Sequence, residues 1–133
     1  MPHLQLDVNR PLTDAQRRTL ADAVRTEFAR IMSTGTDHIA VSIREHPTYA
    51  LDLGRVCDHA AGVALVNADL REGRGLRQRR ELAVTFVAIL ERLLSIPPSH
   101  VYITFTEHKG EDFHLNERYL AGWTPSEEQD PPV

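Results

Sequence analysis

The sequence contains an internal repeat, which constrains the fold more strongly than any single motif. Residues 2–46 align with residues 64–108 at a constant offset of 62 positions, and 11 of the 45 aligned pairs are identical. The identities fall in clusters, of which the clearest are Gln16–Ala21 with Gln78–Ala83, His38 with His100, and Glu45-His46 with Glu107-His108. The two segments are therefore predicted to fold as one supersecondary unit that is used twice.

Each half of the repeat predicts a strand, a helix and a second strand. In the first half, apolar and polar residues alternate over residues 3–8, which is typical of a strand. Thr13 and Gln16 match a capping box, so we expect a helix that begins after Thr13 and ends near Met32. Alternation then returns over residues 39–43, which predicts the second strand.

The second half predicts the same order of elements. We expect a strand over residues 63–70, a helix over about 76–94 and a last strand over 101–106. Residues 47–62 connect the halves, with a short strand expected near Leu51–Leu53. Two joined β-α-β units with their helices on one side form an α/β two-layer sandwich with a four-stranded main sheet. The other face of that sheet is left uncovered, which indicates an oligomer.

Composition narrows the classes of function. With 133 residues, 41% of them apolar, the chain has the size and the core of one domain. We expect this domain over residues 1–123 and a disordered, acidic, proline-rich tail over 124–133. A net charge of −4 argues against nucleic acid as a partner. No apolar run approaches the roughly 20 residues of a membrane span, so no membrane partner is predicted.

Cysteine and histidine usage argues against a metal site. The single cysteine, Cys57, fits a reducing cytoplasm, and we expect its side chain to be buried. The seven histidines stand without HxH or HxxxH spacing, and no Cys/His zinc motif or nucleotide-binding motif occurs. The sequence therefore predicts neither a metal nor any other cofactor.

Several short motifs carry a resemblance to a known family. They are Met1-Pro2, Leu12-Thr13, Thr34-Gly35-Thr36, Leu53-Gly54, Arg71-Glu72-Gly73-Arg74 and His100. Together with the doubled β-α-β unit, these motifs make residues 2–123 resemble the tautomerase superfamily, which includes 4-oxalocrotonate tautomerase and macrophage migration inhibitory factor. Within it, the chain resembles the cis-3-chloroacrylic acid dehalogenase group. The resemblance implies a homotrimer in which the sheets face inward and each N-terminal proline lies in a pocket.

The resemblance implies that Pro2 is the catalytic base, and the chemistry of the group suits this role. Removal of Met1 would expose a secondary amine, and free α-amino groups titrate at about 7.7–8.0. A partly apolar pocket, or the neighbouring Arg71 and Arg74, would lower that pKa towards the working pH. Each guanidinium could also hold a carboxylate by two hydrogen bonds, or stabilise the charge that grows on an enolate oxygen. The expected substrate is therefore a small carboxylate.

The resemblance also implies a carboxylate from the C-terminal segment. In the dehalogenase group, an acidic residue a little after the last long strand orients water or relays a proton. Glu117 is the expected counterpart here, with Glu111 and Asp112 as rivals. A surface role for all three remains an alternative.

Two departures from the dehalogenase pattern bear on the reaction type. A helix histidine and a strand tyrosine of that group correspond here to Phe28 and Thr104, which we expect at the substrate site. Phe28 also lies on the apolar stripe of its helix, so its default role is core packing. Tyr119 could supply a hydroxyl group from the C-terminal segment. With fewer polar groups to activate water, hydrolytic dehalogenation is not favoured.

Three functional hypotheses follow. The leading one is a keto–enol tautomerase of small 2-oxo and 2-hydroxy-enoate acids, with Pro2 as the general base. The second is a hydratase, dehalogenase or decarboxylase of three-carbon acids such as 3-haloacrylates, in which Pro2 acts as an acid. The third is a binding protein that keeps the fold without the activity. Catalysis by a base predicts a rate that rises as the amine loses its proton, and catalysis by an acid predicts the reverse.

Overall fold

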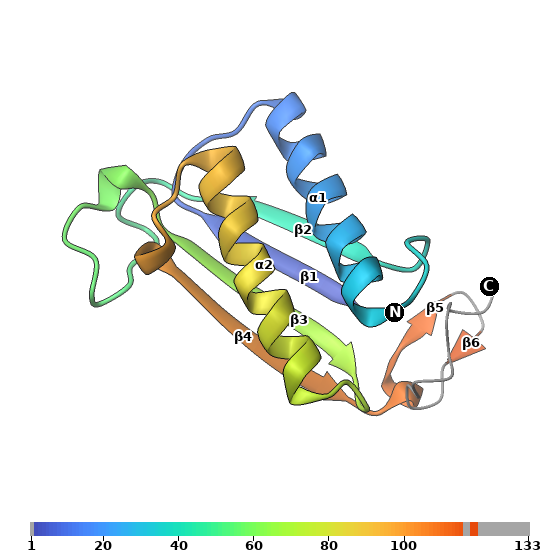
Figure 1. The fold of residues 1–133 in the computed structure, drawn as a ribbon. Helices are drawn as coiled ribbons and strands as arrows, with labels where there is room; N and C mark the ends of the chain where they lie inside the picture. The colour runs from blue at the N-terminus through green and yellow to red at the C-terminus, as the bar shows by residue number, and fades with distance from the viewer. Residues whose placement is uncertain (1, 116–117, 120–133) are drawn as a thin grey trace.

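The computed structural model describes residues 2–115 and 118–119. Two helices lie on one face of a four-stranded sheet, whose strand order is β2-β1-β3-β4 (Figure 1). The main elements are β1 (His3–Val8), α1 (Asp14–Met32), β2 (Ala40–Glu45), β3 (Ala64–Arg71), α2 (Leu76–Leu94) and β4 (Val101–His108). Short elements complete the described chain: the 3-10 helices η1 (His59–Ala61), η2 (Pro98–His100) and η3 (Gly110–Asp112), and the strands β5 (His114–Leu115) and β6 (Arg118–Tyr119). The predicted two-layer α/β sandwich is confirmed.

The repeat is visible in the geometry of the two halves. Each helix has 19 residues, and α2 begins and ends 62 positions after α1. Both helices end at a serine in the left-handed conformation, Ser33 with φ 51° and Ser95 with φ 55°. Within each unit the strands are parallel, whereas β1 and β3 pair antiparallel at the centre of the sheet. The two units therefore run in opposite directions across the sheet.

Several of the identical residues of the repeat form the same ion pairs in both halves. One kind of pair joins the helix to the second strand of its unit, and the other joins the first strand to a histidine at the end of the second. The pairs are Arg17–Glu45 at 2.8 Å, Arg79–Glu107 at 3.0 Å, His46–Asp7 at 2.7 Å and His108–Asp69 at 3.4 Å. The repeat thus preserves the contacts that hold each unit together.

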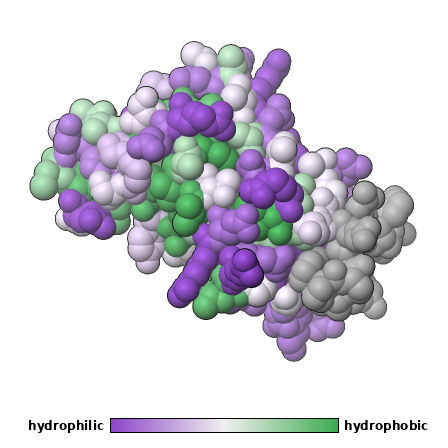
Figure 2. Space-filling view, viewed as in Figure 1, coloured by the Kyte–Doolittle hydropathy of each residue, from purple (hydrophilic) through white to green (hydrophobic). Residues whose placement is uncertain are grey.

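The core lies between the sheet and the helices. Alternate residues of β1 and β3 point towards the helices and are buried, whereas their neighbours point to the other face. The largest buried apolar side chains include Leu4, Leu6, Leu20, Phe28, Met32, Leu70, Leu82, Phe86 and Leu90. On the helix side, Figure 2 shows mostly hydrophilic side chains with apolar ones among them. This arrangement buries one face of the sheet and fixes its register.

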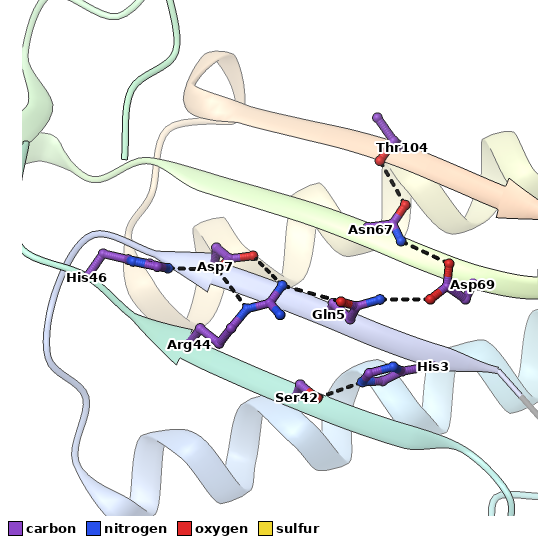
Figure 3. Close-up of polar contacts among 9 residues, drawn as sticks. All are labelled: His3, Gln5, Asp7, Ser42, Arg44, His46, Asn67, Asp69 and Thr104. Atoms are coloured by element: carbon purple, nitrogen blue, oxygen red, sulfur yellow. Dashed lines mark hydrogen bonds and ion pairs between the residues drawn. The ribbon is translucent and has the colours of Figure 1, made fainter. Parts of the chain in front are cut away.

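The face of the sheet that neither helix covers is polar. Its side chains bond to one another across the strands, as Figure 3 shows. The bonds include Gln5 to Asp69 at 2.8 Å, Arg44 to Asp7 at 2.9 Å, Thr104 to Asn67 at 2.9 Å, and His3 with Ser42 at 2.6 Å. We call this surface the open sheet face. The prediction that one face of the sheet is left without helices is confirmed.

Two expectations for the connector between the halves are wrong. The predicted strand at Leu51–Leu53 is absent, because Leu51 instead packs with Val56 and Val63 in a small separate apolar cluster. Cys57 is exposed rather than buried, since its neighbour Val56 takes the inward position. The connector is therefore an irregular segment with a core of its own.

The predicted tail over residues 124–133, and the predicted domain limit at residue 123, lie outside the described residues. Within the described part, neither helix combines the length and the apolar character that a membrane crossing requires.

The Arg17–Glu45 pair predicts a dependence of stability on pH. Hydrogen bonds from the Arg17 guanidinium and the Leu12 amide lower the pKa of Glu45 to about 2. Glutamate in an unfolded chain titrates at about 4.3, so the ionised carboxylate favours the folded state above that pH. This stabilisation is lost as the pH falls towards 2. We therefore expect Glu45→Gln to lower the free energy of unfolding at pH 7 and to have little effect near pH 2.

Urea unfolding of both proteins at pH 7, 4 and 2.5 measures this difference. Glu81→Gln is the matched control, because Glu81 is half exposed on α2 and lies 3.4 Å from Arg30. The control should change stability little at any of the three pH values. An equal loss for Glu45→Gln at all three would contradict the role of its charge.

Candidate active site

Pro2 lies at the end of the sheet where three elements meet. It is buried and comes directly before β1, and its carbonyl accepts a hydrogen bond of 3.0 Å from the Ala40 amide at the start of β2. In the antiparallel pair, His3 lies opposite Asp69 of β3. If this register is continued by one residue, Pro2 lies opposite Leu70, the residue that precedes Arg71 in the chain. The beginning of β1 and the end of β3 therefore share one end of the sheet.

A cavity of about 220 Å³ opens beside Pro2. Its described lining consists of Pro2, His3, His38, Ala40, Phe113, His114 and Leu115. Three histidines supply polar residues to this lining, whereas Phe113 and Leu115 supply apolar ones. The volume is somewhat below the range usual for drug-sized ligands, so the cavity suits a small molecule.

The two arginines of the Arg-Glu-Gly-Arg motif are buried at the same end of the sheet. Arg71 is the last residue of β3 and is 2% exposed, and Arg74 is 4% exposed. The turn between them is held by a hydrogen bond of 2.7 Å from the Glu72 amide to the His108 carbonyl. Gly73 has φ 115°, a conformation that favours glycine. Since guanidinium groups stay protonated in proteins, this turn places two positive charges inside the fold.

Neither arginine belongs to the described lining of the cavity. The Cζ atom of Arg74 lies 6.0 Å from the centroid of the Phe28 ring, within the range of a cation–π contact. Arg74 therefore points towards the helix layer. The arginine turn and the cavity are two adjoining parts of one end of the sheet.

Phe28 and Thr104 are not brought to the cavity within this chain. Phe28 is completely buried in α1 as part of the core, which is the default role that its place on the apolar stripe predicts. Thr104 stands in the middle of β4 on the open sheet face, where its hydroxyl donates to Asn67 Oδ1 at 2.9 Å (Figure 3). Two strands separate Thr104 from the edge strand β2, and three positions separate it from the level of Pro2.

The expected C-terminal site residues are only partly described. Glu117 lies outside the described residues. Its rivals Glu111 and Asp112 lie in η3 and are exposed. The backbone of Tyr119 pairs with His114, which lines the cavity, whereas its side chain is outside the description. The small β5–β6 pair thus runs beside the cavity.

The sequence did not predict that three histidines and residues 113–115 line the cavity beside Pro2. In the sequence, His38 stands out only as a matched position of the repeat and as one of seven histidines without metal-ligand spacing, although the parallel pairing of β1 and β2 brings the start of β2 to Pro2. The parallel strands of a β-α-β unit could have indicated this neighbour. No pattern in the sequence indicates that residues 113–115 fold back to the same end.

At the opposite end of the sheet, the residue that the repeat aligns with Arg71 has a different environment. Asn9 aligns with Arg71, but it is 3% exposed and bonded to backbone on three sides. Its amide group donates to the carbonyls of Thr48 at 3.0 Å and His59 at 2.9 Å, and its oxygen accepts from the Val63 amide at 2.7 Å. Hydrogen bonds from Asn9 to the connector therefore occupy the end of the sheet opposite Pro2.

No metal site accompanies these groups. Among residues 2–115 and 118–119, no three or more His, Cys, Asp and Glu side chains lie together as metal ligands would.

Comparisons with known proteins bear on the fold. Neither a protein-family model nor a curated protein matches the sequence significantly. Solved structures do match: a member of the cis-3-chloroacrylic acid dehalogenase family has a TM-score of 0.79 at 23% identity, covering 90% of this chain and 84% of that one. Macrophage migration inhibitory factor of Toxoplasma gondii has a TM-score of 0.77 at 18% identity, covering 89% of this chain and 99% of that one.

The chain has the tautomerase-superfamily fold. A third match within this fold is malonate semialdehyde decarboxylase, with a TM-score of 0.73 at 20% identity, covering 86% of this chain and 90% of that one. The resemblance to the tautomerase superfamily, the cis-3-chloroacrylic acid dehalogenase group included, is thus confirmed for the fold. At these identities the likeness concerns architecture, and the activities named for these proteins are theirs.

The structure of this chain places Phe28 in the core, and this placement can be tested. We expect Phe28→Ala to lower the free energy of unfolding by about 3–5 kcal/mol, because it removes a buried ring and leaves a cavity. Urea unfolding followed by circular dichroism measures the loss. Val84→Ala on the exposed side of α2 is the control and should change stability by less than about 0.5 kcal/mol. Similar small losses for both variants would place Phe28 outside the core.

Proposed function

We propose that this protein is a keto–enol tautomerase of small 2-oxo and 2-hydroxy-enoate acids, in which Pro2 is the general base. The observation that carries the proposal is the position of Pro2, which is buried at the head of β1 beside a cavity. Arg71 and Arg74 supply two buried positive charges at the same end of the sheet. A base and an anion-binding group are the two parts that ketonisation of a small acid needs.

The proposed base is the secondary amine that removal of Met1 would expose at Pro2. Burial and nearby guanidinium charges both disfavour an ammonium group, so they would lower the pKa of this amine below its usual range. A neutral amine can take the proton from an enol hydroxyl. The electrons of that O–H bond then form the carbonyl group, and the neighbouring carbon gains a proton.

The two arginines are proposed to hold the substrate. One guanidinium would bind the carboxylate by two parallel hydrogen bonds. The other would face the 2-oxygen, whose negative charge grows in the transition state. Because Arg71 and Arg74 recognise only these two features, they would accept any small 2-oxo acid that fits the cavity.

The remaining residues proposed for the site depend on the C-terminal segment and on assembly. Glu117 and Tyr119 would complete the wall of the site, next to the β5–β6 pair. Thr104 would reach a substrate only across a subunit boundary, because it lies on the open sheet face. We propose a homotrimer in which copies of the chain cover that face. A fused 4-OT with the same fold, at a TM-score of 0.76, is described as an asymmetric trimer, which supports this assembly.

A hydratase or decarboxylase of three-carbon acids is the second candidate. The observation that favours it is the structural match to malonate semialdehyde decarboxylase, whose structures are described as explaining decarboxylase and hydratase activities. That chemistry would use a protonated Pro2. Phe28 in the core and Thr104 bonded to Asn67 argue against it, since they leave fewer groups to activate water. A rate that rises with pH as the amine deprotonates separates the tautomerase from this candidate.

Replacement of the base tests the main proposal. We expect Pro2→Ala to lower kcat/KM for ketonisation of phenylenolpyruvate by about 10²–10⁴-fold, the contribution typical of a general base. Absorbance measures the rate, and intact mass establishes whether Met1 has been removed. Pro11→Ala in the exposed turn before α1 is the control and should keep the rate. An unchanged rate for Pro2→Ala would remove the mechanism, and an intact Met1 without turnover would favour a binding protein.

Replacement of Arg71 tests how the substrate is held. Arg71→Lys keeps the charge but loses the planar fork, so we expect KM to rise by about 10–100-fold with a smaller change in kcat. Steady-state kinetics measures both constants. Arg92→Lys on the exposed side of α2 is the control. Thermal unfolding should show that both variants remain folded, and an unchanged KM in a folded Arg71→Lys protein would exclude Arg71 from binding the carboxylate.

A further inference from the structure

We propose that His38 is a second acid–base catalyst of this site, which donates a proton to the substrate carbon while Pro2 takes one from oxygen. The inference rests on the proposed function of Pro2 and adds a residue to it. The observation that carries it is that His38 and Pro2 line the same cavity of about 220 Å³.

The backbone fixes His38 beside the proline. His38 comes two residues before Ala40, whose amide donates to the Pro2 carbonyl at 3.0 Å. Between them, Ile39 is 5% exposed and belongs to the core, and its amide donates to Thr36 at 3.2 Å. The segment that carries His38 is therefore held on one side by the core and on the other by Pro2. A catalytic acid needs such a fixed position relative to the base.

The other titratable groups of the described cavity lining are less suited to this role. The ring of His3 lies on the open sheet face, which points it away from the helix side of the sheet (Figure 3). His114 is exposed on β5. His38 is half-buried, and its segment contacts Pro2 directly. Within the described lining of the cavity, the residues with titratable groups are these three histidines and Pro2.

The proposed step balances two proton transfers. The Pro2 nitrogen takes the proton of the enol O–H group, and the electrons of that bond form the C2=O bond. The C2=C3 electron pair takes a proton from the imidazolium of His38, which forms the new C3–H bond. The protonated Pro2 amine then returns its proton to the neutral imidazole through solvent. Histidine suits this exchange because its ring nitrogens can both donate and accept a proton.

The repeat provides a matched control. His100 is the counterpart of His38 in the second half, and it lies beside the opposite end of the sheet. Its Nδ1 atom lies 2.9 Å from the Gly62 carbonyl. The two ends of β1 are five residues apart, or roughly 17 Å, so His100 is remote from Pro2. A substitution of His100 therefore changes an equivalent histidine without touching the cavity.

Steady-state kinetics with phenylenolpyruvate tests the role of His38. We expect His38→Asn to lower kcat by about 100-fold with little change in KM, and to remove the alkaline limb of the pH–rate profile. Added imidazole should restore part of the activity of His38→Ala. His100→Asn should keep both limbs of the profile. A His38→Asn protein that keeps its kcat would overturn the proposal. So would one that loses rate but keeps the alkaline limb of the pH–rate profile, because a purely structural role would lower the rate without changing the shape of the profile.

Covalent labelling of Pro2 provides a second readout that needs no turnover. One solved structure of this fold, with a TM-score of 0.75 at 14% identity, is described as inactivated by 2-oxo-3-pentynoate, so we choose this compound as the probe. The neutral Pro2 amine would attack C4 of the alkyne and form an N–C bond. One electron pair of the triple bond would move to C3 and take the proton of His38. The amine would then lose its own proton to solvent.

Intact mass and peptide mapping follow the rate of this labelling. We expect wild type and His100→Asn to be labelled at Pro2 at similar rates, and His38→Asn at least tenfold more slowly. Equal labelling of Pro2 in all three proteins would overturn the role of His38 and leave the proposed base intact. No labelling of Pro2 in the wild type would remove the proposed base, and the role of His38 with it.

Discussion

The antiparallel pairing of β1 with β3 is the contact on which the rest of the structure depends. It joins the two β-α-β units at the centre of the sheet and makes them run in opposite directions. As a result, the beginning of β1 and the end of β3 meet at one end of the sheet. Pro2 and Arg71 lie 69 positions apart in the chain, and this pairing is what makes them neighbours.

The two halves keep the same internal contacts but differ where chemistry is proposed. Each unit retains its ion pair between helix and strand, Arg17–Glu45 in the first and Arg79–Glu107 in the second. At one end of the sheet, Asn9 is bonded to the backbone of Thr48 and His59 in the connector and of Val63 just after it. At the other end, a cavity opens beside Pro2. The two units thus share the contacts that stabilise them, and they differ at the ends of the sheet.

The proposed site combines groups from distant parts of the sequence. The head of β1 supplies the amine, the segment before β2 supplies His38, and the turn after β3 supplies two guanidinium groups. None of these elements carries a catalytic motif by itself. The sheet fixes the relative positions of these backbones. The proposed base, the proposed acid and the two guanidinium groups are therefore held at one end of it.

The sequence by itself determined the repeat, both helices with their ends, the four long strands and the two-layer class, because periodicity and capping are local properties of the chain. It also indicated Pro2 and the Arg71–Arg74 turn through a resemblance. Only the tertiary structure decided that His38, Phe113 and His114 surround Pro2, that Phe28 belongs to the core, and that Thr104 stands on the open sheet face. Those placements depend on strand order and on the path of the connections, which bring together residues far apart in the chain and leave no periodic signal in it.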